Sequence, residues 1–121
     1  MRSNELRIGN LVKVDSNPFE SVTQIFKDGV VTDAYDVVNS FKDLEPIPLT
    51  EEWLIKFGFE KTSDNMYWVQ PDNFMYFELN NFGIIATFPD SVADFGKRVN
   101  NVHSLQNLYF ALTGEELTIR D

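Results

Sequence analysis

The sequence predicts an α+β protein with a small, bent, SH3-like β-sheet, a short helix, an antiparallel β-meander and a C-terminal helix packed on the sheet. Three observations predict it. Apolar residues three to four apart over residues 102–112, followed by Gly114, are typical of a helix that ends at a glycine. Short apolar runs between residues 59 and 88 alternate with turns rich in Asn, Asp and Pro, as in antiparallel hairpins. Asp28-Gly29, between two apolar runs, predicts a hairpin near the N-terminus.

The length and composition favour one folded domain. The chain has 121 residues, and a typical domain has ~100–150. Hydrophobic residues make up 43% of the chain, which is enough for a core and too many for a disordered protein. We therefore expect a single domain over residues 1–121. Residues 1–45 would form its N-terminal β part, and residues 46–121 would hold the short helix, the meander and the C-terminal helix.

The charge balance bears on possible partners. The formal net charge is −9. Proteins that bind nucleic acid usually neutralise phosphates with clustered Lys and Arg, so this charge argues against nucleic acid as a partner. An acidic surface often does no more than keep a protein in solution. It also suits a basic partner protein or a DNA-mimicking inhibitor, although such mimics carry denser rows of carboxylates than this chain has.

The chain contains no cysteine, which excludes disulfides, thiolate catalysis and cysteine-type zinc sites. Residues 1–7 have no apolar run behind their positive charge, so we expect no signal peptide. No apolar stretch approaches the ~20 residues that a membrane span requires. These features predict a cytoplasmic protein with no membrane partner.

The N-terminal third predicts short, strongly bent strands. Residues 6–14 are expected to form a strand that Gly9-Asn10 interrupts as a bulge or a tight bend. Residues 21–26 predict a second strand, and residues 30–32 begin its hairpin partner. A bent strand followed by a hairpin suits a sheet of the SH3-like kind, a fold that says little about its ligand.

The segment between the predicted sheet and the first helix is less regular. Residues 34–41 fit a short strand or a turn equally well. Pro46 and Pro48 remove amide donors and push the residues before them away from the helical region. We therefore expect residues 44–49 to be an extended link.

A short helix is predicted over residues 50–58. The hydroxyl of Thr50 can cap its start, and the helix dipole favours Glu51 and Glu52 in its first turn. Gly58 would end it. Two successive glutamates also suggest acid–base or metal chemistry, but neighbouring residues on a helix point about 100° apart. We therefore expect a structural role for this pair.

The predicted meander carries apolar residues on both of its faces. Apolar side chains alternate to both sides in residues 74–79 and again in residues 82–88. A solvent-exposed face would carry polar residues. We therefore expect both faces of the meander to be covered, one of them by the C-terminal helix. The other face is covered either within the chain or by a partner. In the second case Tyr67, Trp68 and Tyr76 are the candidate interface residues, because Tyr and Trp are enriched at interfaces.

No residue pattern in the chain predicts catalysis. His103 is the only histidine, and we expect it near the helix start in a structural role. Ser104 follows it, but successive helical residues do not face each other, so the pair predicts no Ser-His chemistry. A zinc site on one histidine would need carboxylates from elsewhere, and the isolated glycines form no phosphate-binding loop. We therefore expect no catalytic residue, no metal and no cofactor.

Three segments of the chain are jointly distinctive. They are residues 4–12 (NELRIGNLV), 44–54 (LEPIPLTEEWL) and 102–117 (VHSLQNLYFALTGEEL). Together they resemble a family of small uncharacterised proteins from Bacteroides-type bacteria and their phages or mobile elements. The resemblance implies an intracellular accessory protein, encoded by a prophage or a mobile element. It transfers no activity and no catalytic residue.

The sequence predicts a non-enzymatic, cytoplasmic protein-interaction module that binds a protein partner, or self-associates, through its aromatic surface. One alternative is a nucleic-acid-associated accessory factor whose aromatic rings stack on single-stranded bases, or a DNA-mimicking inhibitor. Another is a hydrolase whose carboxylates assemble only in three dimensions. The acidic charge argues against the nucleic-acid factor, and the hydrolase requires a pocket in which Asp, Glu and His103 converge.

Overall fold

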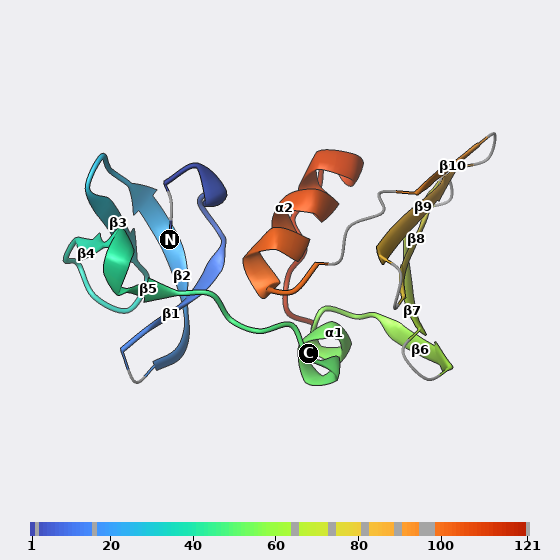
Figure 1. Ribbon diagram of the computed structural model, residues 1–121, viewed down its shortest axis with the longest axis horizontal. Helices are drawn as coiled ribbons and strands as arrows, with labels where there is room; N and C mark the ends of the chain where they lie inside the picture. Colours follow the sequence, from blue (N-terminus) through green and yellow to red (C-terminus); the bar gives the residue numbers. More distant parts are fainter. Residues whose placement is uncertain are drawn as a thin grey trace. The chain divides into compact units, whose positions relative to one another are not determined.

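The computed structural model describes the backbone of residues 1, 3–15, 17–63, 66–72, 75–80, 83–88, 91–94 and 99–120. Side chains are described for residues 1, 4–15, 17–62, 67–68 and 99–120. The described residues form two antiparallel sheets and two α-helices (Figure 1). The predicted α+β fold class is therefore confirmed.

The chain divides into two compact units. The first contains Met1–Pro48 and Asn100–Glu116, and the second contains Leu49–Val99 and Leu117–Asp121. The C-terminal helix thus belongs to the same unit as the N-terminal strands. The expectation of one domain, with its two parts divided after residue 45, stays a prediction.

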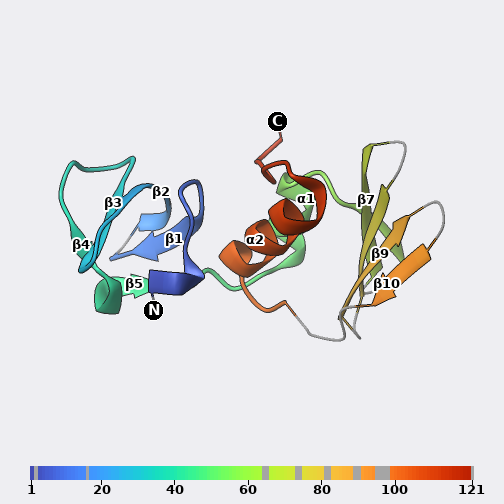
Figure 2. The ribbon, with the colours of Figure 1, turned by 90° about the horizontal axis from the view of Figure 1, so that it is seen from above.

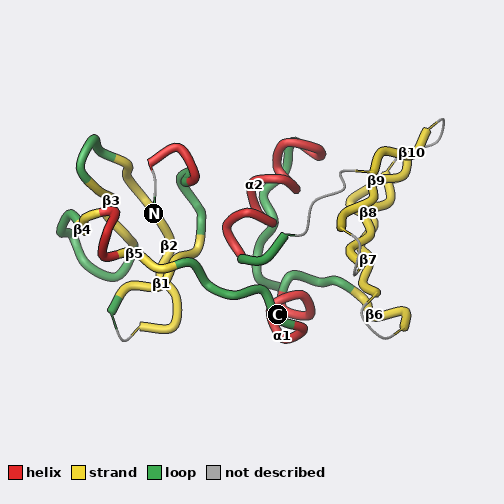
Figure 3. The backbone as a smooth tube through the Cα atoms, in the orientation of Figure 1, coloured by secondary structure: helices red, strands yellow, loops and turns green. Residues whose placement is uncertain are grey.

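The first unit is built on a five-stranded antiparallel sheet with the order β4-β3-β2-β1-β5 (Figure 1). The last strand returns to pair with the first, and the 3-10 turn η2 lies between β4 and β5 (Figure 3). This is the strand order of an SH3-like sheet, so the predicted small SH3-like sheet is confirmed. Its elements are η1 (Ser3–Glu5), β1 (Leu11–Val14), β2 (Asn17–Ile25), β3 (Gly29–Thr32), β4 (Asn39–Ser40), η2 (Phe41–Asp43) and β5 (Leu44–Glu45).

Two irregularities in register bend the long strand β2. The pairing of β1 with β2 shifts between Val12 and Val14, and the pairing of β2 with β3 shifts between Val22 and Gln24. Bulges of this kind kink a strand and increase its twist. Strand β2 can therefore pair with β1 along its first half and with β3 along its second half.

The expected strand over residues 6–14 is found only from Leu11 onward. Before it, Gly9 has a φ of 95°, a backbone conformation that glycine adopts at little steric cost. The Gly9 N–H donates to the Val22 carbonyl at 2.8 Å, and the Asn10 N–H donates to the Arg7 carbonyl at 3.1 Å. Residues 7–10 thus form a tight turn, with Ile8 and Gly9 at its centre, that leads into β1.

The core of the first unit is aliphatic. One cluster of buried side chains comprises Leu6, Val12, Val14, Val22, Val30 and Leu44, with Met1 and Phe41 packed against it. Leu11 is buried as well, although it precedes Val12 and points to the opposite side of β1. Strand β1 is therefore covered on both sides.

Helix α2 (Val102–Thr113) covers the second side of β1. Its start is capped by the Asn101 side chain, which accepts from the Ser104 N–H at 3.0 Å. Its end is capped by Gly114, whose φ is 75° and whose N–H donates to the Phe110 carbonyl at 2.8 Å. The predicted helix and its glycine end are confirmed. The sequence assigned this helix to the meander, whereas the structure packs it on β1 of the N-terminal sheet.

The chain leaves and re-enters the first unit at paired positions. Pro48 and Asn101 form an isolated antiparallel bridge. Beside it, the Val102 N–H donates to the Ile47 carbonyl at 2.9 Å. These bonds join the two segments of the unit at the point where the rest of the chain departs.

The second unit contains an antiparallel meander, as predicted. Its strands follow the order β10-β9-β8-β7-β6, so each strand pairs with its neighbour in the sequence (Figure 1). Figure 2 shows β7, β9 and β10 of this sheet from above. The strands are β6 (Glu60–Ser63), β7 (Met66–Asp72), β8 (Met75–Asn80), β9 (Gly83–Phe88) and β10 (Ser91–Asp94).

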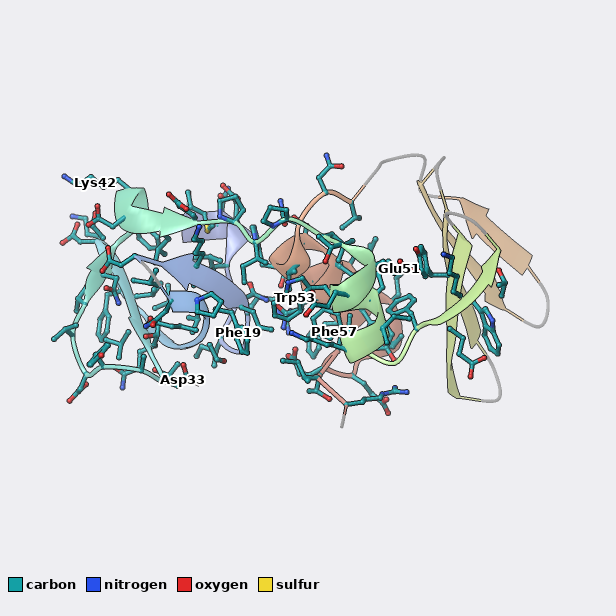
Figure 4. The ribbon with its side chains drawn as sticks, turned by 90° about the horizontal axis from the view of Figure 1, so that it is seen from below. Phe19, Asp33, Lys42, Glu51, Trp53 and Phe57 are labelled. Carbon is teal, nitrogen blue, oxygen red and sulfur yellow. The ribbon has the colours of Figure 1, made fainter. Side chains whose placement is uncertain are left out.

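The predicted short helix is found as α1 (Glu51–Lys56). Its cap is the Thr50 hydroxyl, which accepts from the Trp53 N–H at 3.4 Å, and Gly58 follows it with a φ of 90°. The rings of Trp53 and Phe57 lie one helical turn apart with their centroids at 5.7 Å (Figure 4). The Arg120 N–H donates to the Lys56 carbonyl at 2.7 Å, which ties the C-terminal segment to the end of α1.

The register of the meander places residues in rows across its strands. One row runs through Glu60, Trp68, Glu78, Ile85 and Asp94. Members of one row lie on one face of the sheet. Acidic positions therefore alternate with apolar positions on this face, and the expectation of two wholly apolar faces does not hold there.

Gly114→Ala should lower the free energy of unfolding by about 1 kcal/mol. Gly114 has φ = 75°, and a side chain in this left-handed conformation costs roughly 1–2 kcal/mol. A Cβ there would meet no atom within 4 Å, so the effect comes from the backbone and not from a clash. Urea unfolding followed by circular dichroism measures it. Gly114→Asn is the control and should lose less, because Asn visits this conformation more readily. An alanine variant as stable as the wild type would contradict the assignment of this cap.

Candidate functional site

The most densely bonded polar region of the first unit joins α2 to residues 5–11. Gln106 is buried, and its side-chain carbonyl accepts from the Leu11 N–H at 2.8 Å. Its amide nitrogen donates to the Gly9 carbonyl at 3.1 Å. The turn before β1 leaves these two backbone groups without strand partners. One glutamine side chain from α2 therefore completes the hydrogen bonding of the turn.

Asn107 forms the second half of this connection. Its side-chain carbonyl accepts from Asn10 Nδ2 at 2.8 Å and from Arg7 Nη1 at 2.7 Å. Its amide nitrogen donates to the Glu5 carbonyl at 2.7 Å. These bonds and those of Gln106 are here called the amide network. All of its polar atoms have partners, so it acts as a structural connection and leaves no group directed at a ligand.

Arg7 extends the amide network to the end of α2. Its guanidinium also pairs with the Glu116 carboxylate. The guanidinium carbon lies 4.0 Å from the centroid of the Phe110 ring, which is a cation–π geometry. The positive charge of Arg7 is thus satisfied within the unit.

His103, the only histidine, lies beside the amide network. Its side chain is 1% exposed, and its Nε2 lies 3.4 Å from Glu5 Oε2. Its Nδ1 is buried and has no hydrogen-bond partner. Burial lowers the pKa of His103 below its usual value, and the hydrogen bond and charge of Glu5 oppose that effect only in part. The imidazole is therefore neutral near pH 7, as the expected structural role requires.

The described residues bring no reactive set together around this histidine. The Ser104 N–H is used in the helix cap at Asn101. In the part of the chain whose side chains are described, no three His, Cys, Asp or Glu residues are grouped so that they could hold a metal ion. The His103–Glu5 pair can bind or release a proton.

The three residues predicted for an interface lie on the meander. Tyr67 and Trp68 are successive residues of β7 and are partly exposed, so they lie on opposite faces of the sheet. Glu78 on β8 is the cross-strand partner of Trp68. Tyr76 comes two residues before Glu78, so its position is on the same face of the sheet as Trp68. The side chain of Tyr76 lies outside the described residues. The register therefore places Trp68 and Tyr76 on one face and Tyr67 on the other.

Tyr67 also takes part in bonding within the second unit. Lys61 Nζ lies 3.0 Å from Glu51 Oε1. The hydrogen bond and charge of Lys61 lower the pKa of Glu51, and a hydrogen bond from Tyr67 adds to the shift. This carboxylate from the predicted acidic pair thus has a structural role. The interface role of Tyr67, Trp68 and Tyr76 stays a prediction.

A group of exposed apolar side chains on the first unit was not predicted. It lies at the end of the β2–β3 hairpin and in the connection from β3 to β4. We call it the hairpin surface, and its members with their exposed fractions are Ile25 (37%), Phe26 (48%), Tyr35 (67%), Val37 (58%) and Val38 (56%). The one sequence signal for it was the apolar content of residues 34–41, which fitted a short strand or a turn equally well.

Backbone pairing brings the two segments of the hairpin surface together. Gly29 pairs with Ser40, and the Phe26 N–H donates to the Gly29 carbonyl at 2.8 Å. A Cβ built on Gly29 would lie 3.0 Å from Val38 Cγ1, so Val38 packs directly over this glycine. The Val38 side chain and the Phe26 backbone therefore both adjoin Gly29.

Charged side chains surround the hairpin surface. Asp28, Asp33 and Asp36 are exposed, as is Lys27. The carboxylate of Asp33 accepts from the Ser21 N–H at 2.9 Å, and the Asp33 N–H donates to the Ser21 carbonyl at 2.9 Å (Asp33 is labelled in Figure 4). These two bonds fix the start of the connection that carries Tyr35 and Val37.

Comparison with models of protein families, with curated proteins and with solved structures gave no match. Among the described residues, no helix is both long enough and apolar enough to cross a membrane.

Replacing Gln106 should destabilise the protein strongly. Gln106→Met keeps the length of the side chain but leaves the buried Leu11 N–H and the partly buried Gly9 carbonyl without this partner. An unsatisfied buried group costs about 1–3 kcal/mol, so we expect a loss of at least about 2 kcal/mol in the free energy of unfolding. Gln24→Met on β2 is the matched control, because Gln24 is exposed and should change stability by no more than about 0.5 kcal/mol. Urea unfolding of both variants tests this, and equal losses would contradict it.

The stability of the first unit should fall between pH 7.5 and pH 5.5 because of His103. An unfolded histidine titrates near pH 6.5, and burial places the folded pKa of His103 lower. The unfolded chain therefore binds the proton first, so the stability is fully present above pH 6.5 and is lost as the pH falls toward the folded pKa. Urea unfolding at three pH values measures the slope.

His103→Gln is the control for this pH dependence. It removes the only group of the chain whose ordinary pKa lies near 6.5, so its stability should be nearly flat from pH 7.5 to pH 5.5. NMR titration of the imidazole gives the folded pKa directly. A folded pKa above 6.5, or the same slope in the variant, would contradict the prediction.

Proposed function

We propose that the chain is a non-enzymatic protein-interaction module that binds a partner through the hairpin surface of its SH3-like unit. The observation that carries this proposal is the concentration of exposed apolar side chains there. The described residues include ten exposed large hydrophobic side chains, and five of them form the hairpin surface within residues 25–38. Scattered single exposed hydrophobic residues are normal, whereas several within one short stretch of the chain support an interaction site.

The composition of the hairpin surface also supports binding. Phe26 and Tyr35 contribute large rings, and aromatic side chains are enriched where proteins contact one another. The backbone beneath is fixed by strand pairing at Gly29 and by the two bonds between Asp33 and Ser21. A pre-formed surface loses less conformational entropy on binding than a mobile one.

The predicted surface on the meander remains a second place for the same function. Trp68 is partly exposed, and the register puts the position of Tyr76 on its face. The bonding of Tyr67 to Glu51 favours the hairpin surface over a site that includes Tyr67. Nucleic-acid association, DNA mimicry and carboxylate hydrolysis receive no comparable support from any described contact. With the resemblance noted above, we place the module in the bacterial cytoplasm, as cargo of a prophage or mobile element.

The interaction function is tested with a double variant of the hairpin surface. Tyr35→Ser with Val37→Ser removes the two most exposed of its apolar side chains, so the fold should not change. The immobilised full chain should retain a specific protein from a lysate of its source organism, and the double variant should retain less than a tenth of it. Quantitative mass spectrometry measures the retained amounts.

The control removes as much apolar surface elsewhere. Ile8→Ser with Ile55→Ser changes two side chains that are also more than half exposed, and it should bind like the wild type. Equal retention by all three proteins would contradict the proposal. If only Trp68→Ala lost retention, the binding site would lie on the meander, and the proposal that the hairpin surface binds the partner would be wrong.

A further inference from the structure

We propose that the hairpin surface recognises a partner protein segment that presents apolar side chains next to Lys or Arg. This inference rests on the proposed function and adds the chemistry of the partner. It follows from two properties of the same residues, their exposed apolar atoms and the sign of the charges between them.

The apolar half of the recognition comes from two neighbouring segments. Ile25 ends β2 and Phe26 follows it, while Tyr35, Val37 and Val38 lie in the connection that returns to β4. Val38 packs over Gly29, whose carbonyl accepts from the Phe26 N–H, so Val38 and the end of β2 adjoin the same glycine. Apolar side chains of a partner that covers this point would be removed from water together with Phe26 and Val38.

The charged half comes from the acidic residues within the same segments. Residues 25–38 contain three acidic side chains, Asp28, Asp33 and Asp36, and one basic side chain, Lys27. Their local net charge is 1 − 3 = −2, and all four side chains are exposed. A partner with Lys or Arg beside its apolar residues would be complementary to this pattern, which raises the association rate and the specificity.

The same charges decide against other occupants. A second copy of the chain would bring a further net charge of −9 and would place like charges opposite Asp28 and Asp36. Nucleic acid would bring phosphates to the same carboxylates. A protein segment with both basic and apolar side chains is the one occupant whose contacts with the apolar residues and with the carboxylates of the hairpin surface are both favourable.

The experiment selects ligands from random sequences and so needs no identified partner. The full chain is the bait for a displayed library of random 12-residue peptides, and the most enriched peptide is synthesised with a fluorescent label. The enriched sequences should combine aromatic or aliphatic residues with Lys or Arg. Fluorescence anisotropy should show tenfold or greater weakening with Asp36→Lys, and weaker binding as salt increases. Tyr35→Ser with Val37→Ser should abolish binding.

Glu115→Lys is the matched control, since it makes the same change of net charge at an exposed carboxylate beyond the end of α2. Its affinity should stay within twofold of the wild type. An effect as large as that of Asp36→Lys would show that only the total charge matters, which would overturn the inference. Thermal melts of all variants confirm that each remains folded.

The outcomes separate the partner chemistry from the function itself. Neutral or acidic peptides that lose binding in Tyr35→Ser with Val37→Ser would overturn the partner chemistry and leave the interaction function standing. A concentration-dependent dimer in sedimentation, broken by the same double variant, would make a second copy the occupant and would also overturn the inference. No enriched peptide, or peptides that bind every variant equally, would overturn both proposals.

Discussion

The attachment of α2 to residues 5–11 is the constraint on which the first unit depends. Gln106 and Asn107 bond to groups that lie 95 to 102 positions away in the sequence. These bonds satisfy a turn that has no strand partner, and they hold α2 against β1, so that β1 is buried on both sides. The core of the sheet and the capped helix are therefore parts of one arrangement, and Gly9 permits it because its positive φ lets the chain form the turn to which Gln106 bonds.

Local sequence signals predicted the elements well, since each depends on residues that are close in the chain. The α2 helix followed from apolar spacing and Gly114, α1 from Thr50 and Gly58, and the β2–β3 hairpin from Asp28-Gly29. The partner of α2 was not predictable in the same way. Gln106 and Asn107 look like solvent-facing residues in the sequence, and only the fold shows that unpaired backbone groups at residues 9–11 need them. Register shifts such as that between Val22 and Gln24 likewise have no local signature.

The candidate site shows the same division between local and tertiary information. Tyr67 and Trp68 were chosen by residue type, and their alternation on β7 was already implied by a strand. The acidic row that includes Glu78 and Asp94 depends on the register of five strands, which the sequence does not specify. The hairpin surface was not predicted because residues 34–41 fit a short strand and a turn equally well, and neither fixes which side chains face solvent. Whether Val37 and Val38 face solvent is decided by the sheet around Gly29 and not by their own neighbours in the chain.

The bridge between Pro48 and Asn101 has a consequence for how such a chain can change over time. Because Pro48 and Asn101 are bonded to each other, the residues between them form one long loop with fixed ends. The entropic cost of closing a loop rises only slowly with its length. Hairpins can therefore be gained, lost or exchanged within residues 49–99 without altering the spacing of the two ends. The bonds that hold α2 to residues 5–11 lie outside residues 49–99, so the first unit would keep them through such changes.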